Sequence, residues 1–265
     1  MEQIGVIAGN GQFPLIFARA ARQLGYRLVT VAHRGETQPE LACEVDEIVW
    51  LQVGELGRMI EVFHRAGVTH AVFVGGIRKQ ALLDHFVPDE RGLAFLSRLP
   101  HFGDDALLRG LAQELETEGI RILPSTMFLD SLLTPPGPLT PGELAPQQWE
   151  DVRFGLRVAK AIGEWDIGQT VVVQNRIVLA VEAIEGTDAT IERAGRRGAV
   201  VVKVSKPQQD LRFDVPAVGP RTVAVCARVG VSVLALEARK TLMLEKDALL
   251  AAARECGLAV VGVEP

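Results

Sequence analysis

Short apolar runs alternate with segments whose apolar residues recur every three or four positions. The short runs, bounded by turn residues, are typical of buried strands, and the wider spacing is typical of amphipathic helices. In the first half, strands are predicted over residues 4–8, 27–32, 47–51, 70–76 and 120–125. Helices are predicted over 13–24, 57–67 and 105–119. Because strands and helices alternate, the pattern favours an α/β fold with a doubly wound, mostly parallel sheet.

The second half shows a second set of apolar runs after a proline-rich break. Residues 134–146 contain five prolines, so this stretch is expected to form neither helix nor sheet and to act as a stiff linker. Beyond it, helices are predicted near 147–163 and over 244–257, and strands over 169–174, 176–183, 199–205, twice within 222–238, and over 258–263. The link at 174–176 is expected to be a hairpin turn. The predicted organisation is therefore a first domain at 1–133, a linker at 134–146 and a second α/β domain at 147–265.

Length, charge and cysteine usage narrow the functional classes. A chain of 265 residues can bury two cores, and its formal net charge of −5, with only 5% aromatic residues, argues against a nucleic-acid partner. The cysteines Cys43, Cys226 and Cys256 have no metal-ligand spacing, which fits a cytoplasmic protein. Neither a signal peptide nor an apolar run long enough to span a bilayer is visible, so membrane contact is expected to be peripheral.

Two glycine motifs follow predicted strands. Gly9, Asn10 and Gly11 would let backbone N–H groups approach a phosphate or sugar, although a tight structural turn is the alternative. A nicotinamide site is not expected, because the third glycine of the dinucleotide fingerprint is missing and His33 stands where that fingerprint requires an acid. The second motif adds two cations to a glycine pair, which suits a phosphate group, with a solvated basic turn as the alternative. Its residues are Gly75, Gly76, Arg78 and Lys79.

Carboxylates gather at two helix starts. Asp104 or Asp105 is expected to be an N-cap. In the segment 182–188, three carboxylates and the Thr187 hydroxyl crowd a junction between strand and helix. Such a cluster is costly unless a cation or a hydrogen-bond network stabilises it, so Asp188 is a candidate metal ligand and a structural network is the alternative.

The segment 203–219 carries the strongest chemical signal. It combines cations that could neutralise a diphosphate with carboxylates that could hold Mg²⁺ or orient a water, and diphosphate hydrolysis needs both. A salt-bridged surface loop is the alternative. The candidate residues are Lys203, Lys206, Gln209, Asp210, Arg212 and Asp214.

Several common catalytic motifs are absent from the sequence. All five histidines lie between His33 and His101, and there is neither a G-x-x-x-x-G-K-[ST] loop nor a G-x-S-x-G elbow. Carboxylates without histidine favour Mg²⁺, with Mn²⁺ as an alternative, and the predicted ligands are Asp188, Asp210 and Asp214.

Taken together, five segments resemble the LpxI family of UDP-2,3-diacylglucosamine pyrophosphatases. The resemblance covers essentially the whole chain in the same order, and the segments are 7–14, 75–79, 103–108, 178–188 and 206–219. It implies a Rossmann-like N-terminal domain, a C-terminal α/β domain and a site between them. It also implies Mg²⁺-dependent cleavage of UDP-2,3-diacylglucosamine to UMP and 2,3-diacylglucosamine 1-phosphate (lipid X), a step of lipid A synthesis in Gram-negative bacteria. The family's essential aspartate is assigned to Asp214 first and Asp210 second.

Two other functions remain open at this point. A different nucleotide-sugar enzyme, such as a transferase or epimerase, could use the same scaffold without releasing UMP. A noncatalytic nucleotide or lipid sensor would bind UDP-sugars and would not need Asp214. The hydrolase interpretation places the protein in the cytoplasm, peripheral to the inner membrane, and a homo-oligomer is compatible with the sequence.

Overall fold

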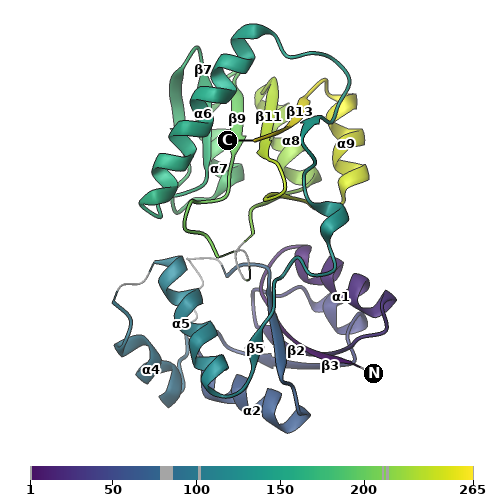
Figure 1. The fold of residues 1–265 in the computed structure, drawn as a ribbon, viewed down its shortest axis with the longest axis vertical. Helices are drawn as coiled ribbons and strands as arrows, with labels where there is room; N and C mark the ends of the chain where they lie inside the picture. The colour runs from purple at the N-terminus through teal and green to yellow at the C-terminus, as the bar shows by residue number, and fades with distance from the viewer. Residues whose placement is uncertain (1, 78–85, 101–102, 211, 213–214, 265) are drawn as a thin grey trace. The chain divides into compact units, whose positions relative to one another are not determined.

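The chain forms two compact units in the computed structural model (Figure 1). The structure describes residues 2–77, 86–100, 103–210, 212 and 215–264. The first unit comprises Met1–Asp130 together with Asp210–Asp214, and the second comprises Ser131–Gln209 together with Val215–Pro265. The chain therefore passes from one unit to the other three times, after Asp130, after Gln209 and after Asp214.

Within the described residues, the first unit is built on a parallel sheet with strand order β3-β2-β1-β4-β5. The strands are β1 (Gln3–Ala8), β2 (Arg27–His33), β3 (Glu47–Leu51), β4 (His70–Val74) and β5 (Arg121–Ile122). The connecting helices are α1 (Phe13–Gln23), η1 (Pro39–Cys43), α2 (Leu56–Ala66), α4 (Glu90–Ser97) and α5 (Asp104–Thr117). Strand order runs outward from β1 in both directions, so the topological switch point lies between β1 and β4. The predicted Rossmann-like fold is confirmed.

The apolar residues that predict the helices and strands of the first unit form its buried core. Phe63 of α2 and Leu115 of α5 are completely buried and pack in one cluster with Val29 and Val31 of β2. Helix α2 ends at Gly67, which adopts the left-handed conformation (φ 71°) that glycine reaches at little cost. The N-cap of α5 is Gly103, so the expectation that Asp104 or Asp105 caps this helix is wrong.

The second unit is built on a mixed sheet with strand order β6-β13-β11-β9-β7-β8. Strands β9 (Val200–Lys203), β11 (Val233–Glu237) and β13 (Ala259–Val263) are parallel. Strands β7 (Thr170–Gln174), β8 (Ile177–Val181) and β6 (Gly137–Pro138) run antiparallel to their neighbours. A separate pair joins β10 (Ala217–Val218) to β12 (Leu242–Met243).

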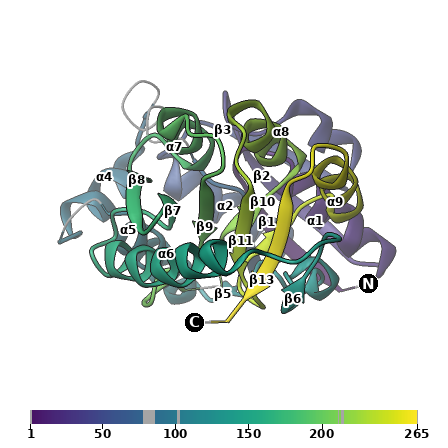
Figure 2. The same ribbon diagram turned by 90° about the horizontal axis from the view of Figure 1, so that it is seen from above.

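Helices cover both faces of this sheet, which makes its central strands continuously apolar (Figure 2). Along β9, Val200 and Val202 pack towards α6 (Pro146–Glu164), whereas Val201 belongs to the cluster on the other face. That second cluster includes residues of three further helices. They are α7 (Thr187–Ala194), α8 (Pro220–Val229) and α9 (Lys246–Glu255).

Two local expectations for this unit are wrong. The segment 222–238 was expected to hold two strands, but its first part belongs to α8, and only β11 follows. Pro220 is the first residue of this helix, and Gly230 follows its last residue in the left-handed conformation. Proline at the start and glycine after the end are typical of a helix, so these two residues distinguish the helix from a strand. The proline-rich stretch 134–146 was expected to exclude sheet, yet Gly137–Pro138 pairs with β13 at the sheet edge, where proline is tolerated.

The hairpin expected at 174–176 is present. Strands β7 and β8 pair antiparallel, and Asn175 and Arg176 both have positive φ, at 53° and 57°, as a tight hairpin turn requires. In the part of the chain that the structure describes, no helix has the length and apolar character needed to cross a membrane. A short helix, η2 (Asp130–Leu132), lies where the chain first passes between the units.

Candidate functional site

The two predicted glycine motifs meet at the switch point of the first unit. Gly9 N donates to Val74 O over 2.8 Å, and Asn10 N donates to Gly76 O over 2.7 Å. A Cβ atom on Gly9 would lie 2.2 Å from Gly76 O, and one on Gly75 would lie 2.5 Å from Asn10 O. Only glycine fits at these two positions, because real Cβ atoms essentially never approach so closely. The loops after β1 and β4 are therefore held together by their backbones.

In the loop after β1, Gly11 adopts φ +80°, and no atom of the described residues lies within 4 Å of where its Cβ would stand. A glycine here leaves the backbone accessible to a ligand, as expected for a phosphate or sugar site. Among the described residues, no atom lies within 4 Å of where a Cβ on Gly76 would stand. Arg78 and Lys79, predicted to add positive charge, lie outside the described residues.

A polar group from the end of β2 borders the same loops. His33 Nδ1 donates to Ala8 O over 2.9 Å, and Thr37 Oγ1 donates to the same carbonyl over 2.7 Å. Burial lowers the pKa of His33 despite the Ala8 carbonyl and nearby carboxylates, which favours a neutral ring. The buried carboxylate of Glu36 accepts a hydrogen bond from Asn10 Nδ2 at 3.0 Å. Glu36 was not among the predicted site residues, because the dinucleotide fingerprint has its acid at the end of the second strand, where this chain has His33.

In the second unit, Lys203 and Thr187 are brought together in a buried network. Lys203 Nζ donates to Thr187 Oγ1 over 2.6 Å, and Thr187 Oγ1 donates to Glu182 Oε1 over 2.8 Å. Burial acts to raise the pKa of Glu182, but the Lys203 ammonium and hydrogen bonds from Thr170, Thr187 and the Gln169 backbone outweigh it. The pKa therefore lies below its ordinary value, and Glu182 is a carboxylate. Glu182 and Thr187 of the segment 182–188 are thus held in a hydrogen-bond network with Lys203.

Lys206 and Gln209 are held by the second unit just beyond β9. Lys206 Nζ lies 2.5 Å from Asp166 Oδ1, and its backbone N donates to Gln209 Oε1 over 2.8 Å. The adjoining Ser205 is fixed by Glu237, whose fully buried carboxylate accepts from Ser205 N and from Lys160 Nζ, at 2.8 and 2.6 Å. The start of the predicted diphosphate-binding segment is therefore anchored rigidly.

Asp210 and Arg212 belong to the first unit. The Arg212 guanidinium binds both carboxylate oxygens of Asp210, with Nη2 at 2.8 Å from Oδ2 and Nε at 3.0 Å from Oδ1. Arg109 and Glu116 of α5 approach the same pair. Hydrogen bonds from Arg212, opposed by burial, hold the pKa of Asp210 below its ordinary value. Asp214 lies outside the described residues.

Of the three predicted metal ligands, Asp188 and Asp210 lie among the described residues. Asp188 accepts from Thr222 Oγ1 at 3.0 Å and pairs with Arg221 Nε at 3.0 Å. Among the described residues, no three His, Cys, Asp or Glu side chains are grouped to hold a metal ion. Asp188 belongs to the second unit and Asp210 to the first, and each is bound by an arginine.

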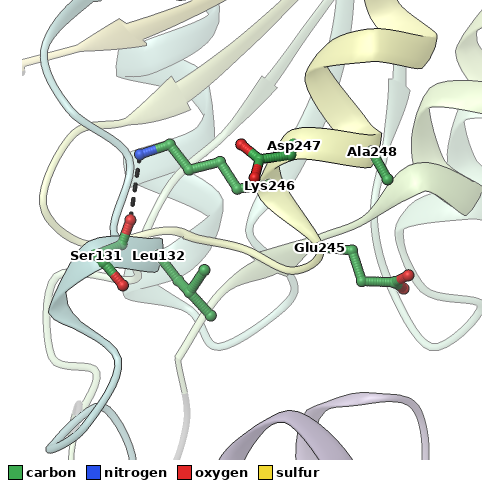
Figure 3. A pocket seen from close by; sticks show the side chains of 6 residues that line it. All are labelled: Ser131, Leu132, Glu245, Lys246, Asp247 and Ala248. Carbon is green, nitrogen blue, oxygen red and sulfur yellow. Dashed lines mark hydrogen bonds between the residues drawn. The ribbon is translucent and has the colours of Figure 1, made fainter. Parts of the chain in front are cut away.

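A cavity of about 620 Å³ lies at the start of α9 in the second unit (Figure 3). Lys246 Nζ donates to Ser131 O over 3.2 Å at its edge, and Glu245 extends away from that contact. None of the candidate residues from the sequence lines this cavity, which is bordered by Ser131, Leu132, Glu245, Lys246, Asp247 and Ala248.

The strand order of the first unit and the glycine loops at its switch point define a Rossmann-like α/β protein with a second α/β unit. The chain belongs to the LpxI family: the LpxI N-terminal domain model matches residues 3–132 and the LpxI C-terminal domain model matches residues 135–261. A relative from Caulobacter vibrioides, named UDP-2,3-diacylglucosamine pyrophosphatase LpxI, is 34% identical over 279 aligned positions, covering 100% of this chain and 99% of the relative. The family predicted from the motifs is confirmed.

Solved structures give weaker likenesses. The biotin carboxylase domain of a thermophilic 2-oxoglutarate carboxylase bound to ADP has 18% identity and a TM-score of 0.30, and the match covers 65% of this chain and 35% of that one. The biotin carboxylase subunit of pyruvate carboxylase has 16% identity and a TM-score of 0.28 over the same shares. The chain thus spans about a third of the length of these structures, and scores this low carry no argument about function.

Proposed function

We propose that the chain hydrolyses UDP-2,3-diacylglucosamine to UMP and 2,3-diacylglucosamine 1-phosphate (lipid X), a step of lipid A synthesis. The observation that carries the proposal is the full-length match to a relative named as a UDP-2,3-diacylglucosamine pyrophosphatase. In this reaction a water oxygen bonds to one phosphorus while the bridging oxygen leaves with the other phosphate. Negative charge grows on the phosphoryl oxygens, so the enzyme needs a group that activates water and cations that neutralise charge.

The candidate residues divide between these tasks. The backbones of Gly9, Asn10, Gly11, Gly75 and Gly76 are proposed to approach the substrate at the switch point of the first unit, which is where ligands bind in open α/β sheets. The cations and polar groups are proposed to bind the diphosphate and sugar. They are Arg78, Lys79, Thr187, Lys203, Lys206, Gln209 and Arg212.

Asp214 is proposed as the essential carboxylate, with Asp210 second. The geometry of Asp210 supports this order, because the Arg212 guanidinium binds both of its oxygens and lowers its pKa. A carboxylate with a low pKa is a weaker base, and one clamped by arginine is poorly placed to take a proton from water. Asp210 then positions Arg212, which could neutralise phosphoryl charge.

A divalent cation, Mg²⁺ or alternatively Mn²⁺, is proposed as the cofactor. When bound, it would neutralise charge on the diphosphate, and carboxylate oxygens are the ligands that Mg²⁺ prefers. The proposed ligands are Asp188, Asp210 and Asp214, together with the phosphates of the substrate. Since the substrate carries two acyl chains, we further propose that the enzyme works in the cytoplasm at the surface of the inner membrane.

The test is direct hydrolysis by the purified full chain. The protein is incubated with UDP-2,3-diacylglucosamine in mixed micelles with Mg²⁺, and UMP and lipid X are measured by mass spectrometry. The proposal requires equal amounts of both products and their loss in an Asp214→Asn variant with an unchanged melting curve. Transfer of the sugar to an acceptor without release of UMP would indicate a transferase, and an isomerised UDP-sugar would indicate an epimerase. Binding without any product would indicate a sensor.

A further inference from the structure

Just beyond β9, the backbone of Ser205 is held by side chains from two other elements of the second unit. Ser205 N donates to Glu237 Oε2 over 2.8 Å, and Ser205 O accepts from Lys160 Nζ at 2.8 Å. The two side chains are also paired with each other, with Lys160 Nζ 2.6 Å from Glu237 Oε2. Lys160 belongs to α6 and Glu237 is the last residue of β11. Together they form a clamp on both backbone groups of Ser205.

The Ser205 clamp is built on a buried, ionised carboxylate. Glu237 is completely buried, and Lys240 Nζ lies 3.0 Å from its second oxygen, Oε1. Burial acts to raise the pKa of Glu237, but the ammonium groups of Lys160 and Lys240 and the hydrogen bond from Ser205 N outweigh it, so the pKa lies below its ordinary value. A buried ion pair seldom adds net stability over apolar side chains of similar volume, so the geometry that it fixes is its more informative property.

That geometry fixes the peptide group that leads into Lys206. Ser205 O and Lys206 N belong to one planar peptide unit. Lys160 holds the oxygen of this unit, and Gln209 Oε1 accepts from its nitrogen at 2.8 Å. Because the unit is planar and is held at both its oxygen and its nitrogen, the Cα atom of Lys206 has a defined position from which the side chain extends.

We propose that Lys160 and Glu237 are positioning residues, which hold the backbone of Lys206 in place while its side chain binds the diphosphate of the substrate. In the structure the Lys206 ammonium is paired with Asp166 at 2.5 Å, so a diphosphate would compete with this carboxylate. The flexible stem of a lysine allows the ammonium to change partners, and a backbone that is already fixed lowers the cost of ordering the bound state. This inference rests on the proposed function, because it takes Lys206 as a residue that binds the diphosphate.

The chain offers a matched control on the same helix. Asp151 of α6 is 3% exposed, and its carboxylate accepts from Asn175 N at 3.0 Å and from Arg176 N at 2.6 Å. It therefore holds the backbone of the turn between β7 and β8, which contains none of the candidate substrate-binding residues. Loss of either buried carboxylate should lower the Tm, but only loss of Glu237 should weaken ligand binding.

The experiment measures binding of UDP to the full chain by isothermal titration calorimetry, with a melting curve for each variant. Lys206→Met should weaken UDP binding about tenfold, the usual scale for a hydrogen bond to a charged group. Glu237→Gln should weaken it about threefold to fivefold through the lost positioning, and Asp151→Asn by less than about 1.5-fold. In the Lys206→Met background, Glu237→Gln should cause less than about 1.5-fold further loss, because a residue that acts through Lys206 has no effect without it.

Lys160→Met tests the same clamp if Glu237→Gln fails to fold, because Glu237 keeps Lys240 as its cation in that variant. The inference is overturned if the wild type does not bind UDP or if the clamp variants bind it as the wild type does. It is also overturned if Asp151→Asn weakens binding equally, or if the losses from Glu237→Gln and Lys206→Met add in the double variant.

The hydrolysis assay separates this result from the proposed function. In an active enzyme, loss of the Ser205 clamp should raise KM for the substrate and leave kcat within about twofold, as expected for a change in binding alone. A protein that binds UDP through the clamp but releases no lipid X would keep the positioning role and lose the proposed reaction. A protein that releases lipid X with equal KM in Glu237→Gln and Asp151→Asn would keep the reaction and lose the positioning role.

Discussion

Replacing Lys203 by methionine tests whether the buried network in the second unit depends on its charge. The Lys203 residue is only 4% exposed, and its ammonium donates to Thr187, which in turn donates to Glu182. Methionine keeps most of the aliphatic stem but removes the cation. Glu182, which is also buried, would then be a carboxylate without its compensating charge. Removing one partner of a buried pair costs about 3–5 kcal/mol, a large share of the 5–15 kcal/mol by which a typical domain is stable.

The stability difference between the wild type and Lys203→Met should also depend on pH, which tests the same reasoning independently. In the wild type the pKa of Glu182 is below its ordinary value of 4.5, so its contribution to stability is present above pH 4.5 and is lost as the pH falls through the folded-state pKa. In Lys203→Met, burial is no longer opposed by the ammonium, and the pKa of Glu182 should rise. Protonation then stabilises the variant as the pH falls. The difference in unfolding free energy between the two proteins should therefore shrink between pH 7.5 and pH 4.5.

The assay is urea unfolding followed by tryptophan fluorescence in a Trp50→Phe background. The chain has three tryptophans, and the remaining two, Trp149 and Trp165, both belong to the second unit. Lys203→Met, Glu182→Gln and the double variant complete a double-mutant cycle. We expect the double variant to be at least about 1 kcal/mol more stable than the sum of the single changes predicts. A coupling below about 0.5 kcal/mol, or a cost that is the same at both pH values, would refute the reasoning.

Three further predictions concern turnover and the first unit. Asp214→Ala should lower kcat roughly a hundredfold or more with little rise in KM, because a carboxylate that acts on the transition state contributes little to ground-state binding. Steady-state kinetics, with a melting curve as the folding control, tests this prediction. A near-normal kcat would mean that the segment 210–214 has a structural role only. Turnover should stop in excess EDTA and return with added Mg²⁺, whereas full turnover in chelator would exclude the proposed cofactor. Burial lowers the pKa of His33, so its folded form binds fewer protons than the unfolded chain, and its contribution to stability is complete above pH 6.5 and decreases below it. His33→Asn should therefore flatten the fall in Tm between pH 7 and pH 5.5, and an unchanged slope would contradict the assignment.

The first unit was largely predictable because its signals are local. Each buried strand is a short apolar run, and each helix shows one apolar face. The error at 222–229, in the second unit, has a physical cause. Val223, Val225 and Val229 stand at alternate positions, as in a strand, while Val225 and Val229 are also four residues apart, as on one face of a helix. Pro220 and Gly230 decide between them, and those end signals were available in the sequence.

The candidate site was less predictable because its contacts join distant positions. Glycines at 9 and 75 could be recognised separately, and the sheet topology then brought their loops together. The Asn10–Glu36 contact spans 26 positions and the Arg212–Glu116 contact spans 96, so neither leaves a periodic pattern. Likewise, Lys206 looked like a free phosphate ligand in the sequence, but it is paired with Asp166, which is 40 positions away.

Residues 210–214 belong to the first unit although they follow residues 131–209 of the second unit, and this limits the order in which the protein can fold. During synthesis, the residues up to Asp130 emerge first and could begin to form the first unit. That unit also includes Asp210 and Arg212, where Arg212 O accepts from Ser125 N and the side chains contact α5. It therefore stays incomplete until residues 131–209 have left the ribosome. A nascent chain arrested before Asp210 would hold the loops after β1 and β4 but would lack the segment 210–214 that completes the first unit.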